Sequence, residues 1–324
     1  MEKFNELIKM AIHKRCSDIF ILPFNDKFRI LLCINGKKKI YKKVTKEEGQ
    51  RLIGYLKYRG NMTVSEHRRP QTGAIQWISE NGNVDLRLSS VGNYQGQESL
   101  VVRFIYPLKI INYNILIKEQ WKRIRELTKQ RGLILFAGPM GSGKTTTMYR
   151  LLRREAEQKV VMTIEDPVEI EEPNFIQLQV NEQAKMGYQE LLRVGLRHRP
   201  DSFIIGEIRD SQTAQMAVQA ALSGHLVLAT VHAKNARGAV TRLKQLGIEN
   251  YYLYQVLTGI CYQRLLPTID GPGVLFEILE GQTLENCIGS QGKRGISDEW
   301  QKQLRDLFST QQISAETINT YKNG

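Results

Sequence analysis

Cysteine and long apolar runs are scarce in this 324-residue chain, and each shortage excludes a class of protein. The four cysteines are scattered and form no C-x-x-C pair, which argues against a structural zinc site and a disulfide framework. We therefore predict four buried thiols, at Cys16, Cys33, Cys261 and Cys287. No stretch approaches the ~18 consecutive apolar residues that span a bilayer. The first residues also lack the charged-then-apolar layout of a secretory signal, so we expect an intracellular protein.

Acidic residues are outnumbered, and the imbalance is concentrated at the beginning of the chain. The net charge is +13, and residues 1–60 contain 15 Lys and Arg against 6 Asp and Glu, a net of +9. Such a region suits an acidic protein partner, an anionic membrane surface or nucleic acid, and it also suits a solvated face without a partner. Lysines 37–39 and 42–43 lack the interleaved aromatic platforms of a single-strand binder. Charge alone therefore does not identify the partner.

Residues 1–106 are predicted to form a compact α+β domain rich in antiparallel pairs. Apolar residues at 4, 7, 8, 11 and 12 follow helical spacing, and strand-like runs recur through this region. Asn35-Gly36 and Asn81-Gly82 favour tight hairpin turns. Thr45 and Glu48 have the spacing of a capping box, which predicts a helix behind them. The expected strands cover 18–22, 28–32, 39–43, 73–79, 84–90 and 99–106.

The pattern breaks at Pro107, and we interpret 107–118 as an interdomain linker. From 119 the chain alternates between predicted helices and predicted strands. This alternation predicts an α/β fold with a parallel sheet covered on both faces. The tail from about 236 is predicted to be mostly helical, with one strand-like patch at 273–279. Before the tail, we expect helices at 119–130, 143–154, 186–198 and 211–222, and strands at 132–137, 159–164, 202–206 and 226–231.

Residues 138–145 read Gly-Pro-Met-Gly-Ser-Gly-Lys-Thr, a complete G-x-x-x-x-G-K-[ST] phosphate loop between a predicted strand and a predicted helix. Its glycines let backbone N–H groups converge on phosphate oxygens, and the helix N-terminus contributes about half a positive charge. Lys144 is predicted to reach the β- and γ-phosphates, and the Thr145 hydroxyl to ligate Mg²⁺. The expected binding residues for a nucleoside triphosphate are Gly138, Pro139, Met140, Gly141, Ser142, Gly143, Lys144, Thr145 and Thr146.

Carboxylates follow two predicted strands. Glu207 comes at the end of the apolar run 203–206, where a phosphate-loop enzyme needs an acid that holds Mg²⁺ through water or orients the attacking water. Glu in place of Asp favours the second role. Glu165, Asp166 and Glu169 follow another strand, which Pro167 prevents from continuing. These acids either position Mg²⁺ and water or form a solvated turn, and their spacing leaves both open.

Two histidines flank the predicted strand 226–231. His225 and His232 are seven residues apart and point to opposite faces of an ideal strand, so we do not expect them to ligate one metal ion. A lone histidine at a strand end is often structural. An imidazole close to a γ-phosphate nevertheless senses whether that phosphate is present.

Four ordered blocks stand out, at 138–147, 163–169, 196–210 and 224–232. Together they resemble the secretion ATPases of type II secretion and type IV pilus systems. In that family they are the Walker A loop, the Asp box, the Walker B segment and the His box. The resemblance implies ATP and Mg²⁺ as ligands, Glu207 orienting the water, Glu165 assisting, and His232 with His225 reporting the γ-phosphate. It further implies a RecA-like domain with a parallel central sheet at 119–324, after a smaller PAS-like α+β domain at 1–106. The blocks are 138–147 (GPMGSGKTTT), 163–169 (TIEDPVE), 196–210 (LRHRPDSFIIGEIRD) and 224–232 (GHLVLATVH).

Other segments extend this resemblance. Ser17-Asp18-Ile19 and Arg29 are similar to the family's S-D-I-H and R-x-D-G segments, with Phe20 and Asn35 as departures, and Gln263-Arg264-Leu265 matches a late family pattern. Strands 84–90 and 101–103 look like the family's arginine-bearing strands, although Gly92-Asn93 stands where the family commonly has Pro-Thr. The resemblance implies that Arg87 and Arg103 approach the nucleotide as the domains close. The alternative is ordinary strand arginines on a solvated face.

Two absences narrow the resemblance. We find neither the extra amino-terminal domain nor the tetracysteine metal module that are frequent in the pilus-extension and type II export enzymes, and no A-I-R-N-L-I-R-E-like helix of the retraction enzymes. The short chain is similar to the ATPases of Gram-positive competence pseudopili, which implies a ring, expected to be a hexamer, at the cytoplasmic face of the cell membrane. It would push a polytopic platform membrane protein that adds pilin subunits, without binding nucleic acid directly. Alternatives are a pilus retraction or general secretion ATPase, a DNA translocase, and a regulator that binds ATP without cycling.

Overall fold

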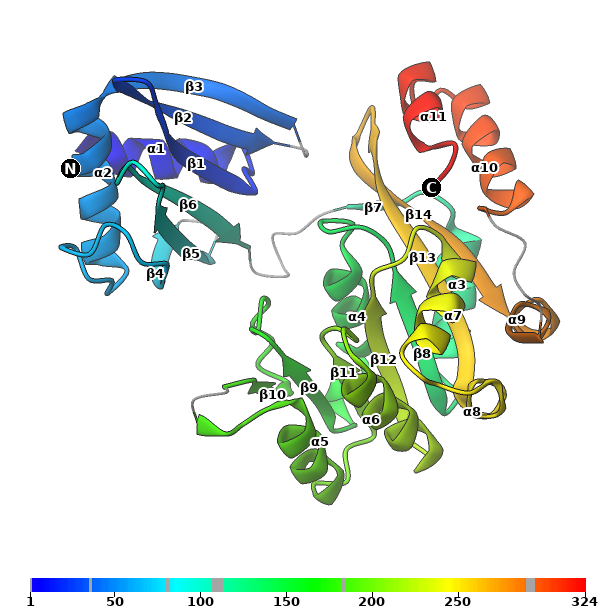
Figure 1. Ribbon diagram of the computed structural model, residues 1–324. Helices are drawn as coiled ribbons and strands as arrows, with labels where there is room; N and C mark the ends of the chain where they lie inside the picture. The colour runs from blue at the N-terminus through cyan, green and yellow to red at the C-terminus, as the bar shows by residue number, and fades with distance from the viewer. Residues whose placement is uncertain (1, 35–36, 80–81, 107–112, 182–183, 290–294) are drawn as a thin grey trace. The chain divides into compact units, whose positions relative to one another are not determined.

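The computed structural model describes residues 2–34, 37–79, 82–106, 113–181, 184–289 and 295–324. The chain divides into two compact units, Met1–Ile111 and Asn112–Gly324 (Figure 1). The predicted linker at 107–118 lies partly outside the described residues, and its described part, from Tyr113 onwards, belongs to the second unit. The turn predicted at Asn35-Gly36 lies outside them as well, as does Asn81 of the second predicted turn. In the described part of the chain, no helix has the length and apolar character needed to cross a membrane.

The first unit contains a six-stranded sheet in the order β3-β2-β1-β6-β5-β4, and every neighbouring pair is antiparallel. This arrangement confirms the antiparallel pairs expected from the sequence. Both helices of the unit bury their apolar faces against one set of strand residues, including Ile19, Leu86 and Val102. The elements are α1 (Glu2–His13), β1 (Asp18–Phe24), β2 (Lys27–Ile34), β3 (Lys37–Thr45), α2 (Lys46–Arg59), β4 (Gln71–Ser79), β5 (Gly82–Gly92) and β6 (Glu98–Ile105).

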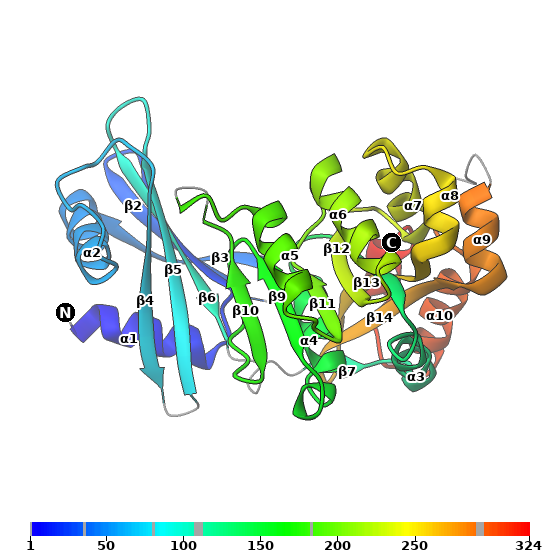
Figure 2. The same cartoon turned by 90° about the horizontal axis from the view of Figure 1, so that it is seen from below.

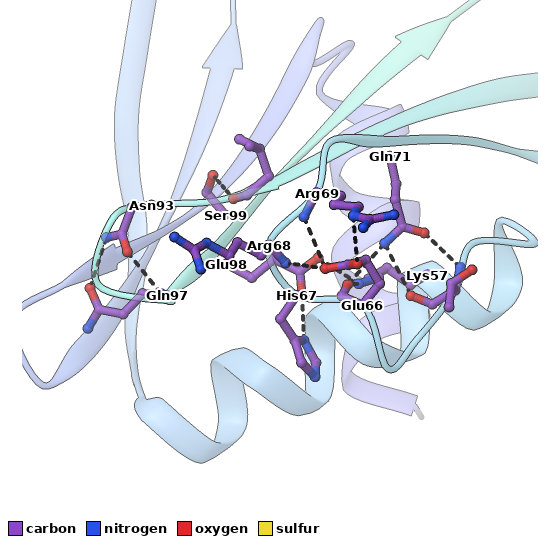
Figure 3. A network of polar contacts seen from close by, with 12 residues as sticks. Lys57, Glu66, His67, Arg68, Arg69, Gln71, Asn93, Gln97, Glu98 and Ser99 are labelled. Carbon is purple, nitrogen blue, oxygen red and sulfur yellow. Dashed lines mark hydrogen bonds and ion pairs between the residues drawn. The ribbon is translucent and has the colours of Figure 1, made fainter.

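Polar contacts fix both ends of α2. At its start, Thr45 and Glu48 form the predicted capping box, with each side chain accepting from the other's backbone N–H at 3.2 Å. Near its end, the fully buried Lys57 donates to Glu98 Oε1 at 2.6 Å and to the Glu66 carbonyl. The other carboxylate oxygen of Glu98 lies 3.0 Å from Nδ1 of His67 (Figure 3). These contacts compensate the buried charge and tie the segment after α2 to β6.

The second unit contains an eight-stranded sheet in the order β10-β9-β11-β12-β8-β13-β14-β7. The strands from β10 to β13 in this order run parallel (Figure 2), which confirms the parallel sheet predicted for β8, β9, β11 and β12. Every residue of β8, β9, β11 and β12 is buried, so both faces of this part of the sheet are covered. The elements up to β12 are β7 (Asn114–Ile115), α3 (Lys118–Leu127), β8 (Gly132–Ala137), α4 (Lys144–Leu152), a 3-10 turn (Glu155–Glu157), β9 (Val161–Glu165), β10 (Phe175–Gln179), α5 (Tyr188–Arg197), β11 (Ser202–Ile205), α6 (Ser211–Leu222) and β12 (Leu226–Val231).

The rest of the second unit contains a long hairpin that the sequence interpretation did not include. β13 (Leu257–Thr268) pairs parallel with β8 and antiparallel with β14 (Gly271–Glu280), which covers the predicted patch at 273–279. The four cysteines are buried free thiols, as predicted. The remaining elements are α7 (Ala236–Gln245), α8 (Asn250–Val256), α9 (Gly281–Gly289), α10 (Asp298–Ser309) and α11 (Ala315–Tyr321).

Candidate nucleotide-binding site

The parallel sheet brings the sequence blocks together at the edge formed by the carboxyl ends of its strands. Neighbouring strands β9, β11, β12 and β8 all end on the same side, because they run parallel. The phosphate loop follows β8, Glu165 ends β9, Glu207 follows β11, and His232 follows β12. Ligands in open parallel sheets bind at the carboxyl ends of the strands. The candidate site is therefore this edge.

The phosphate loop has the backbone that an anion site requires. Gly138 has a φ of 146°, and a Cβ there would lie 2.5 Å from the carbonyl oxygen of Gln263. Gly143 has a φ of 83° and precedes α4, which has no side-chain cap at its start. Among the described residues, the buried hydroxyl of Ser142 has no hydrogen-bond partner. Free N–H groups at a helix start and an orphaned buried hydroxyl fit a phosphate group.

Lys144 lies inside this loop. Its Nζ donates to the carbonyl oxygens of Gly138 at 3.0 Å and Pro139 at 2.9 Å. Burial lowers the pKa of Lys144, while the charges of Glu207 and Glu169 act in the opposite direction. The ammonium group is therefore held by the loop's own carbonyl oxygens. Of the other predicted loop residues, Met140 is exposed, Thr145 is half-buried in the first turn of α4, and Thr146 is buried.

Glu207 is held on both carboxylate oxygens. Oε1 lies 2.9 Å from Nε2 of His232, and Oε2 accepts from Nε of Arg209 at 2.6 Å. The hydrogen bond to Glu207 raises the pKa of Arg209. Glu207 remains 17% exposed, so a water molecule can still reach it. Arg209 was not predicted as a site residue, although its position two residues after Glu207 was a usable signal.

Glu165 is buried, so it does not belong to a solvated turn. It is 2% exposed, and Oε1 accepts from the Tyr149 hydroxyl at 2.5 Å. Burial raises the pKa of Glu165. A Cβ at Gly206 would lie 3.2 Å from Cγ of Glu165, so this carboxylate lies against the residue that precedes Glu207.

The neighbours of Glu165 differ from it in exposure. Asp166 is 48% exposed, with Oδ2 lying 3.9 Å from Nη1 of Arg209, and Glu169 is exposed. Burial therefore excludes the solvated-turn interpretation for Glu165, whereas Asp166 and Glu169 are exposed as that interpretation expects. The hydroxyl of Tyr149 also accepts from Nε2 of Gln177 at 2.7 Å, and neither residue was singled out by sequence reasoning.

His225 is not brought to the site. It precedes β12, and His232 follows it, so the two lie about 20 Å apart along the strand. Nδ1 of His225 lies 3.1 Å from the Ala220 carbonyl oxygen, and its ring contacts Phe203 edge-on at 5.3 Å. The structure gives His225 a packing role at the opposite edge of the sheet. Only His232 lies beside a carboxylate of the site.

Arg87 and Arg103 lie in the first unit. They are cross-strand neighbours on β5 and β6, and Nε of Arg103 lies 3.1 Å from Oδ1 of Asp18. Arg103 is 51% exposed and Arg87 is half-buried. Within the second unit, the site described above contains neither of them.

Mg²⁺ fits this site only when the phosphates of a bound nucleotide supply some of its ligands. In the part of the chain that the structure describes, no group of three or more His, Cys, Asp or Glu side chains could hold a metal ion. A nucleotide-bound Mg²⁺ needs few protein ligands, because substrate phosphates and water supply the rest. Thr145 offers one hydroxyl at the start of α4.

Comparison with known proteins identifies a matching family, a similar sequence and two similar structures. The family described as "Type II/IV secretion system protein" matches residues 1–314. Competence protein ComGA of Streptococcus pneumoniae (strain ATCC BAA-255 / R6) is 41% identical over 278 residues, covering 83% of this chain and 85% of that protein. The Yersinia pseudotuberculosis ATPase DotB shares the fold, with a TM-score of 0.76, 20% identity, and 99% and 93% of the two chains covered. The pilus retraction motor PilT with bound ADP gives a TM-score of 0.59 at 25% identity, covering 97% and 91%.

Proposed function

This chain belongs to the family of type II/IV secretion system proteins, and we propose that it is the ATP-hydrolysing motor that powers assembly of a competence pseudopilus for DNA uptake. The similarity to ComGA supports the competence role, and the likeness to an ADP-bound motor supports nucleotide binding. The observation that carries the enzymatic part is Glu207, fixed by His232 and Arg209 at the sheet edge that holds the phosphate loop.

The chemistry follows from the positions of these groups. The N–H groups at the start of α4 and the ammonium of Lys144 bind the β- and γ-phosphates. The Thr145 hydroxyl would hold Mg²⁺, and the ion would supply positive charge that offsets the charge developing on the phosphates. Glu207 accepts a hydrogen bond from the attacking water and orients it in line with the γ-phosphate. Because both of its oxygens are already held, the carboxylate is fixed before the reaction begins.

Glu165 and His232 support this step. The Tyr149 hydroxyl keeps the buried Glu165 in place against Gly206, so the strand end that carries Glu207 is rigid. His232 is 47% exposed and contacts Glu207. A γ-phosphate that accepts a hydrogen bond from His232 therefore also changes the surroundings of Glu207. His232 is therefore our candidate for the γ-phosphate sensor, without His225.

The mechanical part of the proposal rests on the family resemblance. We propose a PAS-like first domain, a RecA-like second domain and a homohexameric ring, peripheral at the inner face of the cell membrane. Arg87 and Arg103 contact the nucleotide when the domains close, and hydrolysis releases that closure. The resulting motion pushes a polytopic platform membrane protein, which adds pilin subunits.

The Glu207→Gln variant tests the enzymatic part. It keeps a hydrogen-bonding side chain of the same size but cannot take a proton, so turnover should fall by about 10²–10⁴ while ATP binding is retained. Multiple-turnover phosphate release and equilibrium binding measure the two quantities. Glu126→Gln, which changes a 57% exposed carboxylate paired with Lys129, is the matched control. Unchanged turnover in Glu207→Gln would remove the assigned base. Hydrolysis that requires added DNA would instead favour a translocase.

A further inference from the structure

Gln263 is a fully buried residue of β13 that lies beside the start of the phosphate loop. β13 pairs parallel with β8, with Tyr262 opposite Ala137, the last residue of β8. The next residues along the two strands are Gln263 and Gly138. The Gln263 carbonyl oxygen is 2.5 Å from the position that a Cβ on Gly138 would take. The backbone of β13 therefore leaves room only for glycine at the first position of the loop.

The side chain of Gln263 reaches the other end of the loop. Nε2 donates to the Ser142 carbonyl at 2.5 Å and is 3.5 Å from the position that a Cβ on Gly143 would take. One residue of β13 thus contacts the loop twice, through its backbone at Gly138 and through its amide at Ser142. Because Ser142 is 3% exposed as well, water does not readily replace the amide as the partner of this carbonyl.

This hydrogen bond fixes the orientation of one peptide group. The Ser142 carbonyl and the Gly143 N–H belong to the same planar trans peptide, so they point in opposite directions. A carbonyl held by Gln263 therefore directs the Gly143 N–H away from β13. Gly143 immediately precedes α4, and its N–H belongs with the donors at the helix start that bind phosphate oxygens.

The oxygen of the same amide lacks a structural partner. Among the described residues, Oε1 of Gln263 is a buried oxygen without a hydrogen bond. A half-paired amide in a core is less favourable than an apolar side chain of similar size, so stability alone does not explain a glutamine here.

Gln120 of α3 is a contrasting buried glutamine. Its Nε2 donates to the Phe276 carbonyl at 2.5 Å, and its Oε1 accepts from the Phe276 N–H at 3.1 Å. Phe276 lies opposite Gln263 in the pairing of β13 with β14. The two glutamines therefore lie close to the same strand pair, but both amide atoms of Gln120 serve the fold, whereas the amide of Gln263 is used by the loop.

We propose that Gln263 is a positioning residue for the phosphate loop, whose amide orients the Ser142–Gly143 peptide so that the Gly143 N–H faces the phosphates of the nucleotide. The proposal rests on the nucleotide site proposed above. Because this N–H binds phosphate before and during the reaction alike, Gln263 contributes to nucleotide affinity and not to the rate of the chemical step.

Gln263→Met tests this role, because it removes the amide and keeps a long, unbranched side chain in the core. We expect Mg-ADP to bind about tenfold more weakly, which corresponds to about 1.4 kcal/mol. KM for ATP should rise by about the same factor, while kcat stays within about threefold of native. Calorimetric titration with Mg-ADP and steady-state phosphate release measure these quantities. Gln263→Leu should show the same loss, and it takes the place of Gln263→Met if that variant does not fold.

The matched control is Gln120→Met, which makes the same change where the lost hydrogen bonds go to Phe276 and not to the loop. Its affinity for Mg-ADP should stay within about twofold of native, even where its unfolding temperature falls. A folded Gln263→Met with native affinity for Mg-ADP would overturn the proposal. A loss confined to kcat, or an equal loss of affinity in Gln120→Met, would overturn it as well. Because Mg-ADP binding needs no turnover, a native chain that binds but does not hydrolyse ATP counts against the proposed function alone.

Discussion

Removing the Arg209 guanidinium should slow ATP hydrolysis with little change in ATP affinity. In Arg209→Ala the Oε2 atom of Glu207 loses the hydrogen bond that it accepts at 2.6 Å, while Oε1 keeps its 2.9 Å contact with His232. The carboxylate is then held at one oxygen and can rotate away from the attacking water. The phosphate loop should be unaffected, because the Arg209 side chain is paired with Glu207 and Asp166.

The expected magnitude follows from the exposure of the pair. Arg209 is 61% exposed and Glu207 is 17% exposed, so solvent screens much of their attraction. A charge-assisted hydrogen bond in such a setting contributes about 1–2 kcal/mol. If this energy serves only to fix the carboxylate for the reaction, kcat should fall by about 5–30-fold. KM for ATP should stay within about threefold, because ground-state binding does not use this contact.

Steady-state phosphate release across a range of ATP concentrations separates the two constants. Arg242→Ala is the matched control, because Nη2 of Arg242 donates at 2.9 Å to the backbone carbonyl of Arg209 and not to the carboxylate that Arg209 holds. It should retain a native kcat. A native kcat in Arg209→Ala would refute the reasoning, as would a loss confined to KM.

Three further predictions concern burial, topology and capping. Burial raises the pKa of Glu165 above its ordinary value of 4.5. Below pH 4.5 the protonated carboxyl group therefore contributes to the free energy of unfolding, and this contribution is lost as the pH rises through the folded-state pKa. Glu165→Gln can still accept from Tyr149, so thermal unfolding should show a gain of about 1 kcal/mol at pH 8 and almost none near pH 4.5; equal gains would contradict the sign. His225→Gln should keep phosphate release within about twofold of native, since His225 lies at the opposite edge of the sheet; a tenfold loss would contradict its placement. Thr45→Ala should lower the free energy of unfolding by about 1 kcal/mol in urea titrations, through loss of the capping box, and no change would show that the helix start is held by other contacts.

Local sequence patterns were enough to predict several elements of the fold. The alternation of apolar segments predicted the parallel sheet, and the Thr45 to Glu48 spacing predicted the cap of α2. β13 was missed because its residues are buried on both faces and show no alternation, and because α8 leads into it without a breaker. β10 is a short strand and the outermost one beside β9, and its own residues did not indicate this pairing.

The site was predictable where each residue belongs to a motif. The loop, Glu207 and His232 meet because they follow strands that run parallel. The same topology places His225 at the other edge, so the strand assignment already contained the reason to separate the two histidines. Tyr149 and Gln177 could not be found in this way, because their roles depend on contacts across the fold that leave no local pattern.

The most direct test of the central claim is multiple-turnover hydrolysis of ATP by the native chain with Mg²⁺, compared with Lys144→Ala. We expect many phosphates released per native chain, and at least about a hundredfold fewer from the variant, because Lys144 is the cation inside the loop. A well-folded native protein that binds ATP but releases at most one phosphate per chain would contradict the account. Equal rates for the two proteins would contradict it as well.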